Sequence, residues 1–208
     1  MRMAFFFDQS RCVGCNACTV SCKDYYNVNP GAVKYRKHWT HEPDTDHGNG
    51  VFYSFVMSCN HCKDPACVAA CGVQAITKRA DGIVVVNRNK CQGLQSCITA
   101  CPFSEPAIAD DRQEPDGKTT WLVKHPMQKC TMCVTRIDKN ELPVCVEACP
   151  MRAIEVGDYD ELLSRHPGAE PLTKERFPYA YDADSNLTTG PSLIIKPRKQ
   201  LVITGPNK

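Results

Sequence analysis

The residues of this chain that could carry chemistry are its fifteen cysteines, in a sequence of 208 residues. The first motif has the spacing C-x2-C-x2-C-x3-C and comprises Cys12, Cys15, Cys18 and Cys22. Three thiolates that follow one another at two-residue gaps on a tight loop can bind three irons of one cubane cluster. The fourth thiolate lies one helical turn beyond the third and points elsewhere. The motif therefore predicts iron–sulfur chemistry.

Three further motifs vary this spacing. The second is C-x2-C-x4-C-x3-C, the fourth carries an eleven-residue insertion, and the third has Leu94 where a second cysteine is expected. The four motifs use every cysteine, so no free thiol remains. The cysteines of the second, third and fourth motifs are Cys59, Cys62, Cys67 and Cys71; Cys91, Cys97 and Cys101; and Cys130, Cys133, Cys145 and Cys149.

The last two cysteines of every motif are separated by three residues, which places them a full helical turn apart. In ferredoxins with two clusters the fourth cysteine of a motif binds the other cluster, so motifs work in pairs. A tight hairpin with a turn at Asp81 and Gly82 joins the second and third motifs, and we expect them to form an inner pair. The first and fourth motifs would then form an outer pair. The predicted ligand sets are cluster A, Cys12, Cys15, Cys18 and Cys149; cluster B, Cys22, Cys130, Cys133 and Cys145; cluster C, Cys59, Cys62, Cys67 and Cys101; and cluster D, Cys71, Cys91 and Cys97.

Leu94 leaves cluster D one ligand short, because leucine cannot bind iron. Gly93 precedes Leu94 as Gly14 precedes Cys15, which indicates a point change inside an intact loop. A cubane with a vacant corner can lose that iron, so we predict three [4Fe-4S] clusters and one [3Fe-4S] cluster. Two alternatives stay open: four [4Fe-4S] clusters, with water or another side chain completing cluster D, and an empty D site.

The elements that must position these motifs indicate an α+β fold with two ferredoxin-like units. Residues 1–50 plus 120–166 would form the outer unit and residues 51–119 the inner unit. Residues 167–208 would form an extended tail that docks on a partner or is loosely attached. The expected elements are strands at 3–8, 51–58 and 119–124, a hairpin over 76–86, an irregular loop at 27–50, and a helix at 159–166 capped by Asp158.

The formal net charge of +2, with basic residues spread along the chain, indicates no nucleic-acid partner. Lys90 and Lys129 each precede a cysteine and could balance cluster charge, although a solvated surface lysine is the commoner outcome. His61 lies between two cysteines and is expected to support the site rather than bind iron. Three other histidines are expected to face solvent or a partner: His38, His41 and His47.

Other classes of protein are disfavoured by the pattern. No apolar run approaches 18 residues, so no membrane span is expected, and the first residues are not read as a signal peptide. Paired cysteines also build zinc sites, but the tight first triplet and fifteen thiolates that do not divide into fours disfavour zinc. A disulfide framework is also disfavoured. No nucleotide-binding fingerprint or nucleophile–base set is present, which predicts a chain that is not itself an enzyme.

The motif order, the insertion in the fourth motif, and segments 6–12, 58–67, 81–86, 143–150 and 160–163 resemble one family over nearly the whole chain. It is the iron–sulfur (electron-transfer, beta) subunit of the dimethyl sulfoxide reductase family of molybdopterin oxidoreductases. The resemblance implies a relay between a large molybdenum or tungsten bis-pterin catalytic subunit and a quinone-binding membrane subunit. It also implies a peripheral place in a membrane-associated complex, extracytoplasmic by co-translocation rather than cytoplasmic.

The resemblance has one departure at a ligand position. Leu94 replaces a cysteine of the dimethyl sulfoxide reductase subunit, whereas the nitrate reductase subunit and some dehydrogenase relatives also lack it and carry a [3Fe-4S] cluster there. The substrate of the catalytic partner and the direction of electron flow stay open. The alternative function is a free-standing polyferredoxin.

Overall fold

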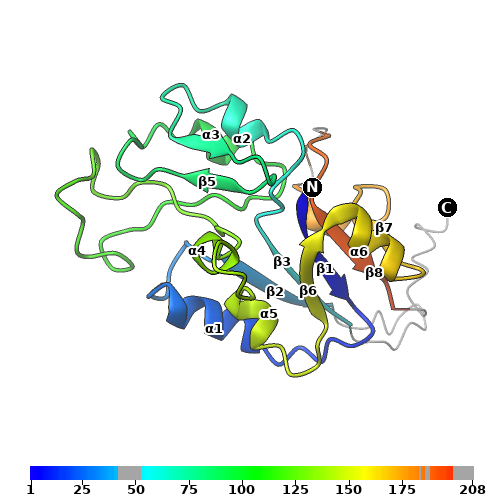
Figure 1. Cartoon of the computed structure of the whole chain (residues 1–208). Helices are drawn as coiled ribbons and strands as arrows, with labels where there is room; N and C mark the ends of the chain where they lie inside the picture. Colours follow the sequence, from blue (N-terminus) through cyan, green and yellow to red (C-terminus); the bar gives the residue numbers. More distant parts are fainter. Residues whose placement is uncertain (42–52, 183, 186–187, 199–208) are drawn as a thin grey trace.

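The computed structural model describes residues 1–41, 53–182, 184–185 and 188–198. Its largest sheet has the strand order β6-β1-β8-β7 (Figure 1). Strand β1 (Met3–Asp8) runs antiparallel to β6 (Ile154–Asp158) and parallel to β8 (Leu193–Lys196). Strand β7 (Glu170–Pro171) pairs with the other side of β8. The strand predicted at residues 3–8 is confirmed.

Strand β1 is buried on both faces, because alternate side chains of a strand point in opposite directions. Phe6 packs with Leu162 of helix α6 (Tyr159–Arg165) and with Ile194 of β8. Phe5 and Phe7 point the other way, into the main hydrophobic core. The continuous apolar run of β1 therefore reflects a strand covered by a helix on one side and by the cysteine-bearing half of the molecule on the other.

A second sheet pairs β2 (Arg36–His41) antiparallel with β3 (Tyr53–Ser58). The expectation of an irregular loop at 27–50 is therefore wrong over residues 36–41, and residues 42–50 lie outside the described part of the chain. Strand β2 forms along β3, and Trp39 packs on Phe55 with 5.7 Å between the ring centroids. The strand predicted at 51–58 is confirmed from Tyr53 onward. Phe55 of β3 joins Phe5 and Phe7 of β1 in the main core.

The predicted hairpin is confirmed as β4 (Ile76–Lys78) and β5 (Val84–Val86). It lies with helices α2 (Ala66–Ala69) and α3 (Ser96–Thr99) at one side of the molecule (Figure 1). A smaller hydrophobic core joins Ile76, Val84 and Met127 there. Helices α1 (Ala17–Tyr25), α4 (Val134–Ile137) and α5 (Val144–Glu147) lie on the side of β1 and β2.

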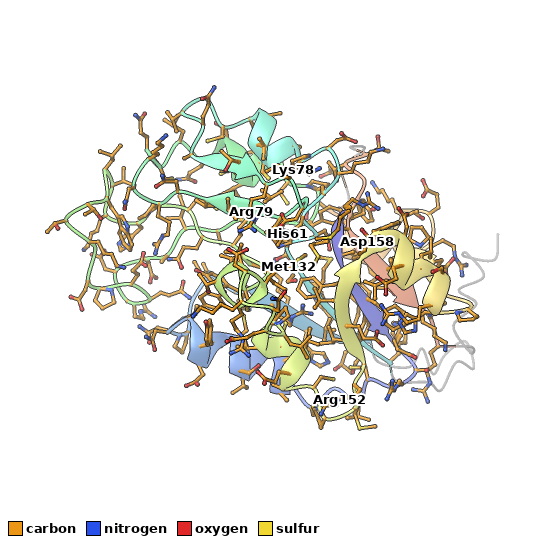
Figure 2. All side chains as sticks on the ribbon, viewed as in Figure 1. His61, Lys78, Arg79, Met132, Arg152 and Asp158 are labelled. Atoms are coloured by element: carbon orange, nitrogen blue, oxygen red, sulfur yellow. The ribbon has the colours of Figure 1, made fainter. Side chains whose placement is uncertain are left out.

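Helix α6 begins where it was predicted, since the Asp158 carboxylate accepts hydrogen bonds from the backbone N–H groups of Asp160 and Glu161. It ends at Arg165, one residue before the predicted end. Figure 2 shows Asp158 at the beginning of this helix. The following His166 stacks on Phe6 with 3.7 Å between the ring centroids, which closes the covered face of β1.

Two further expectations, a strand at 119–124 and an extended tail after residue 167, differ from the structure. Residues 119–124 form turns rather than a strand, and Trp121 is held by the guanidinium of Arg88, whose central carbon lies 3.9 Å from the indole centroid. The described part of the tail is no extended arm, because β7, the 3-10 helix η2 (Pro178–Ala180) and β8 are part of the fold of this chain. The apolar piece at 201–203 lies outside the described residues.

The position of β8 inside the main sheet predicts that truncating a tail side chain destabilises the whole fold. Ile194 is fully buried, so Ile194→Ala should lower the free energy of unfolding by about 2–5 kcal/mol. Urea unfolding followed by far-ultraviolet circular dichroism measures the change. Glu175→Ala, an exposed change in the same tail, is the control and should leave the midpoint unchanged. Equal midpoints for the two variants would contradict this role of β8.

Candidate metal centres

The first and third cysteine loops share one backbone conformation. Gly14 and Gly93 have φ of 69° and 70°, in the left-handed region that glycine adopts without strain. Two positions later Asn16 and Gln95 both have φ of 61°, and each precedes a short helix. Leu94 thus stands in a loop of the same shape as the loop that carries Cys15. The predicted point change inside an intact loop agrees with these dihedral angles.

Helix contacts bring the motifs together in twos. Helix α1, with Cys18 and Cys22, contacts α5, which carries Cys145. Helix α2, with Cys67, contacts α3, which carries Cys97. The flanking strands repeat the same arrangement, since β1 before the first motif pairs with β6 after the fourth, and β5 before the third pairs with β4 after the second. The structure therefore places the first motif beside the fourth and the second beside the third.

The electrostatic neighbours of four thiols come from the same predicted sets. Burial raises the pKa of Cys12, and the thiols of Cys149 and Cys15 raise it further. Burial likewise raises the pKa of Cys22, with contributions from three thiols of the fourth motif. In the inner half, burial raises the pKa of Cys62 to about 12, and burial also raises that of Cys97. The thiols that add to these four effects are Cys149 and Cys15 for Cys12; Cys130, Cys145 and Cys133 for Cys22; Cys59, Cys101 and Cys67 for Cys62; and Cys91 and Cys71 for Cys97.

Two of the predicted sets line cavities. One cavity is bounded by all four cysteines of set A together with His38. The other is bounded by the three cysteines of set D, by Leu94 and by apolar side chains such as Met127. Across the described ranges, no group of three or more His, Cys, Asp or Glu side chains lies close enough to hold a single metal ion. Ligands of a cubane each bind a different iron, so a shared cavity between separated thiols suits a cluster.

Hydrogen-bond donors reach several of the sulfurs. The backbone N–H groups of Met132 and Ala153 lie 3.3 Å from the sulfurs of Cys130 and Cys149 respectively. The Ala75 N–H lies 3.2 Å from the Cys71 sulfur, the Met127 N–H 3.4 Å from that of Cys91, and the Thr189 hydroxyl 3.2 Å from that of Cys62. Such bonds stabilise negative charge on thiolates and raise the potential of a bound cluster.

Comparison with known proteins decides the family. Residues 51–159 match the model of the 4Fe-4S dicluster domain. The sequence is similar to the B chain of the anaerobic dimethyl sulfoxide reductase of Escherichia coli (strain K12), with 35% identity over 211 residues, covering 97% of this chain and 91% of the relative. This protein belongs to the iron–sulfur subunits of the dimethyl sulfoxide reductase family of molybdopterin oxidoreductases.

Two further relatives have different names. The arsenate respiratory reductase iron–sulfur subunit of Shewanella sp. (strain ANA-3) is 30% identical over 204 residues, covering 79% of this chain and 85% of the relative. The B subunit of the tetrathionate reductase of Salmonella typhimurium is 36% identical over 166 residues, covering 79% of this chain and 61% of the relative. The family is therefore shared by subunits of reductases for several substrates.

Two buried cations of this iron–sulfur subunit correct or extend the sequence analysis. Lys129 is 3% exposed, and its ammonium donates to the carbonyl oxygens of Val84 and Cys130 at 2.5 and 3.0 Å, so a solvated lysine is wrong there. Lys90 is exposed as expected. Arg36 is 4% exposed and was missed, because it lies on a strand that the sequence analysis assigned to a loop. Residues 36–41 contain one large apolar residue, Trp39, so no alternation of polar and apolar residues signalled the strand.

The histidines differ in their surroundings. His61 is fully buried at the centre of the molecule (Figure 2), and its Nδ1 accepts a hydrogen bond of 3.0 Å from the Val84 N–H. Burial lowers the pKa of His61 well below its usual value, and Lys129 adds to the effect. His38 borders the set A cavity and is partly buried, and its exposure to solvent or to a partner stays a prediction. His47 lies outside the described residues.

No helix in the described part of the chain is both long and apolar enough to cross a membrane.

The juxtaposition of the first and fourth motifs predicts that two distant cysteines act on one cluster. Cys12→Ser and Cys149→Ser should each remove or alter the same cluster, because each takes one thiolate from set A. Iron analysis and low-temperature electron paramagnetic resonance (EPR) of the purified complex measure the change. Val20→Ser, an exposed change on helix α1 outside the set A cavity, should leave the spectrum as it is. If the two cysteine variants alter different clusters, set A is wrong.

Proposed function

We propose that this chain relays electrons through four iron–sulfur clusters between a molybdenum or tungsten bis-pterin catalytic subunit and a quinone-linked membrane subunit. The proposed ligands are the sets A, B, C and D defined above. The clusters supply the electron-carrying chemistry, and the chain positions them and excludes water from them. The catalytic partner is inferred from the family and from relatives named as subunits of reductases. The chain itself is proposed to be non-catalytic.

The observation that carries the proposal is the continuous order of the thiol sets. Set A meets set B on helix α1, which carries Cys18 and Cys22, and set C meets set D where helix α2, with Cys67, contacts helix α3, with Cys97. Burial raises the pKa of Cys130 to about 12, and Cys59 is the next contributor, which joins set B to set C. Neighbouring thiols link A to B, B to C, and C to D. Such an order suits a linear path that enters at one end and leaves at the other.

The two ends of this order differ from its middle in exposure. Cys15 of set A is exposed, and Val13 and Met151 beside it also face solvent. At the D end, Leu94 is 62% exposed and borders the set D cavity. Sets B and C lie between these ends, where Cys130 and Cys59 are buried. We infer that sets A and D exchange electrons with partner proteins.

The arrangement of paired motifs and flanking strands supports two ferredoxin-like units, one for sets A and B and one for sets C and D. In the complex the chain would be peripheral, on the extracytoplasmic side after export together with the catalytic subunit. Part of the tail that follows residue 167 would also contact a partner. The zinc alternative is not favoured by any observation.

Co-purification tests the proposed function. An affinity tag on this chain, expressed from its native operon under anaerobic conditions, should recover a large chain that contains bis-pterin, together with a brown chromophore. A quinol analogue should bleach the cluster absorbance of the intact complex, because it reduces the clusters. A suitable oxidant should then restore the absorbance. Recovery of the chain alone, fully loaded with clusters and without pterin, would favour the free-standing polyferredoxin instead.

Cluster D is proposed to be a [3Fe-4S] cluster, since three cysteines and Leu94 border its cavity. The Leu94→Cys change should convert it to a [4Fe-4S] cluster, because the loop has the backbone of the first motif. The narrow EPR signal of an oxidised three-iron cluster should disappear, and iron content should rise. Leu94→Ala, which adds no iron-binding atom, is the matched control and should keep the narrow signal.

The two alternatives for set D give other results in the same experiment. A wild-type complex that is fully loaded yet lacks the narrow signal would mean four irons with a non-cysteine ligand. A complex in which Leu94→Cys adds a whole cluster would mean an empty D site in the wild type. Either result overturns the [3Fe-4S] assignment and leaves the relay through A, B and C.

A further inference from the structure

Arg36 is a buried cation whose hydrogen-bond and ring partners are uncharged. It lies on β2 opposite Ser58 of β3 and is 4% exposed. Its Nη2 donates to the Ser58 hydroxyl at 3.3 Å, and its guanidinium carbon lies 4.8 Å from the centroid of the Phe5 ring. A hydroxyl and an aromatic face together hold the guanidinium in place. They do not neutralise its charge.

Within the part of the chain that the structure describes, no carboxylate forms an ion pair with Arg36. The adjacent Lys37 does have one, because its ammonium lies 3.5 Å from a Glu105 oxygen. Glu105 is buried as well, and Arg36 helps to lower its pKa, though less than Lys37 does and against the larger effect of burial. A guanidinium taken out of water without a paired anion costs several kcal/mol. The site therefore requires negative charge from another source.

Thiols surround the site. Helix α1 contacts β2 and carries the buried Cys18 and Cys22. The charge of Arg36 also acts on the buried thiols of Cys145 and Cys130. Three of these four cysteines belong to proposed set B and one to set A. The negative charge that Arg36 lacks in the protein is the charge that cluster B, bound by thiolates, would bring.

We propose that Arg36 is the fixed positive charge that compensates cluster B and raises its reduction potential above that of an otherwise equal cluster. The proposal rests on the ligand sets of the proposed function. Reduction adds one negative charge to a cluster, and a nearby cation stabilises the reduced form more than the oxidised form. Arginine suits this role because it stays protonated at all physiological pH values. Cluster A, which shares only Cys18 with this site, is affected less.

The charge explains why β2 places this residue inside the molecule. An arginine retained only to hold the β2–β3 hairpin could be replaced by any side chain of similar length that bonds Ser58. An arginine that sets a potential can be replaced only by another cation. The two roles therefore separate in a comparison of charge-keeping and charge-removing variants.

The test uses the intact complex and EPR-monitored redox titration. The titration wave of cluster B is first assigned as the one that is lost or altered in the Cys133→Ser complex. Arg36→Gln keeps a hydrogen-bond donor but removes the charge. We expect reduction of cluster B to become about tenfold less favourable, a potential about 59 mV lower for a one-electron couple. The potential of cluster A should fall by less, and those of clusters C and D should stay within error.

Two control variants separate charge from packing. Arg36→Lys keeps the charge and should retain the potential of cluster B, although it loses the guanidinium shape. Arg176→Gln removes an exposed arginine that pairs with Glu170 in the tail, and it should change no potential. If Arg36→Gln and Arg36→Lys lower the potential of cluster B equally, or if neither changes it, the proposal is overturned.

A second route remains if the Arg36→Gln variant does not assemble its clusters. Ser58→Asp places a carboxylate against the guanidinium and neutralises Arg36 in its own site. The potential of cluster B should then fall, and an unchanged value would overturn the proposal. Failure of the underlying ligand sets has a different signature, since Cys133→Ser would then leave every titration wave in place. Some Ser58→Asp complexes could lose clusters. If cluster B then has an unchanged potential in the complexes that keep it, this also counts against the role of Arg36.

Discussion

The last two cysteines of every motif lie four residues apart, and this spacing forces each motif to share its clusters with another motif. Residues four apart share a helix face but lie one turn apart, so one motif cannot close a site with both thiolates. Another motif must approach from elsewhere in the chain. The pairing of β1 with β6 answers this requirement for the first and fourth motifs, and that of β4 with β5 answers it for the second and third.

The many thiols in the interior of this small chain bring negative charge into the core once they bind iron. Burial raises the pKa of Cys22 and Cys130, because a buried thiolate lacks the stabilisation that water provides. Iron binding replaces those protons, so the loaded sites carry negative charge in a medium of low dielectric constant. Arg36 and Lys129 are the buried cations placed next to these sets. Their position links the polar residues of the core to the electron-carrying role that we propose.

The sequence predicted the parts of the fold whose signals are local. The Asp81–Gly82 turn, the Asp158 cap and the run of phenylalanines in β1 each specify an element through neighbouring residues. Strand β2 was missed because its polar residues gain their order from pairing with β3, which lies beyond a segment with turn residues. The strand expected at 119–124 has no partner strand among the described residues, and a strand without partners is not stable.

The tail shows the same limit. Leu193–Lys196 reads as a short apolar piece in a polar segment, and only its distant partners β1 and β7 make it a central strand. The candidate site followed more closely from sequence, because ligand spacing is a local property even when ligands come from distant motifs. Cysteine spacing could not predict that Cys59 and Cys130 join sets B and C, and it could not predict that Arg36 is buried.

The place of Leu94 in this arrangement explains how the molecule can lose a ligand and keep its fold. The loop keeps the dihedral angles of the first motif, so the substitution removes a thiolate without moving the backbone. Leu94 lies at the end of the thiol order and faces solvent, so its exchange disturbs no packed neighbour of sets A, B or C. A change of cluster type at this end alters the potential at one terminal of the proposed relay. The same loss in set B or C would interrupt the relay itself, because electrons must pass both sets to cross the molecule.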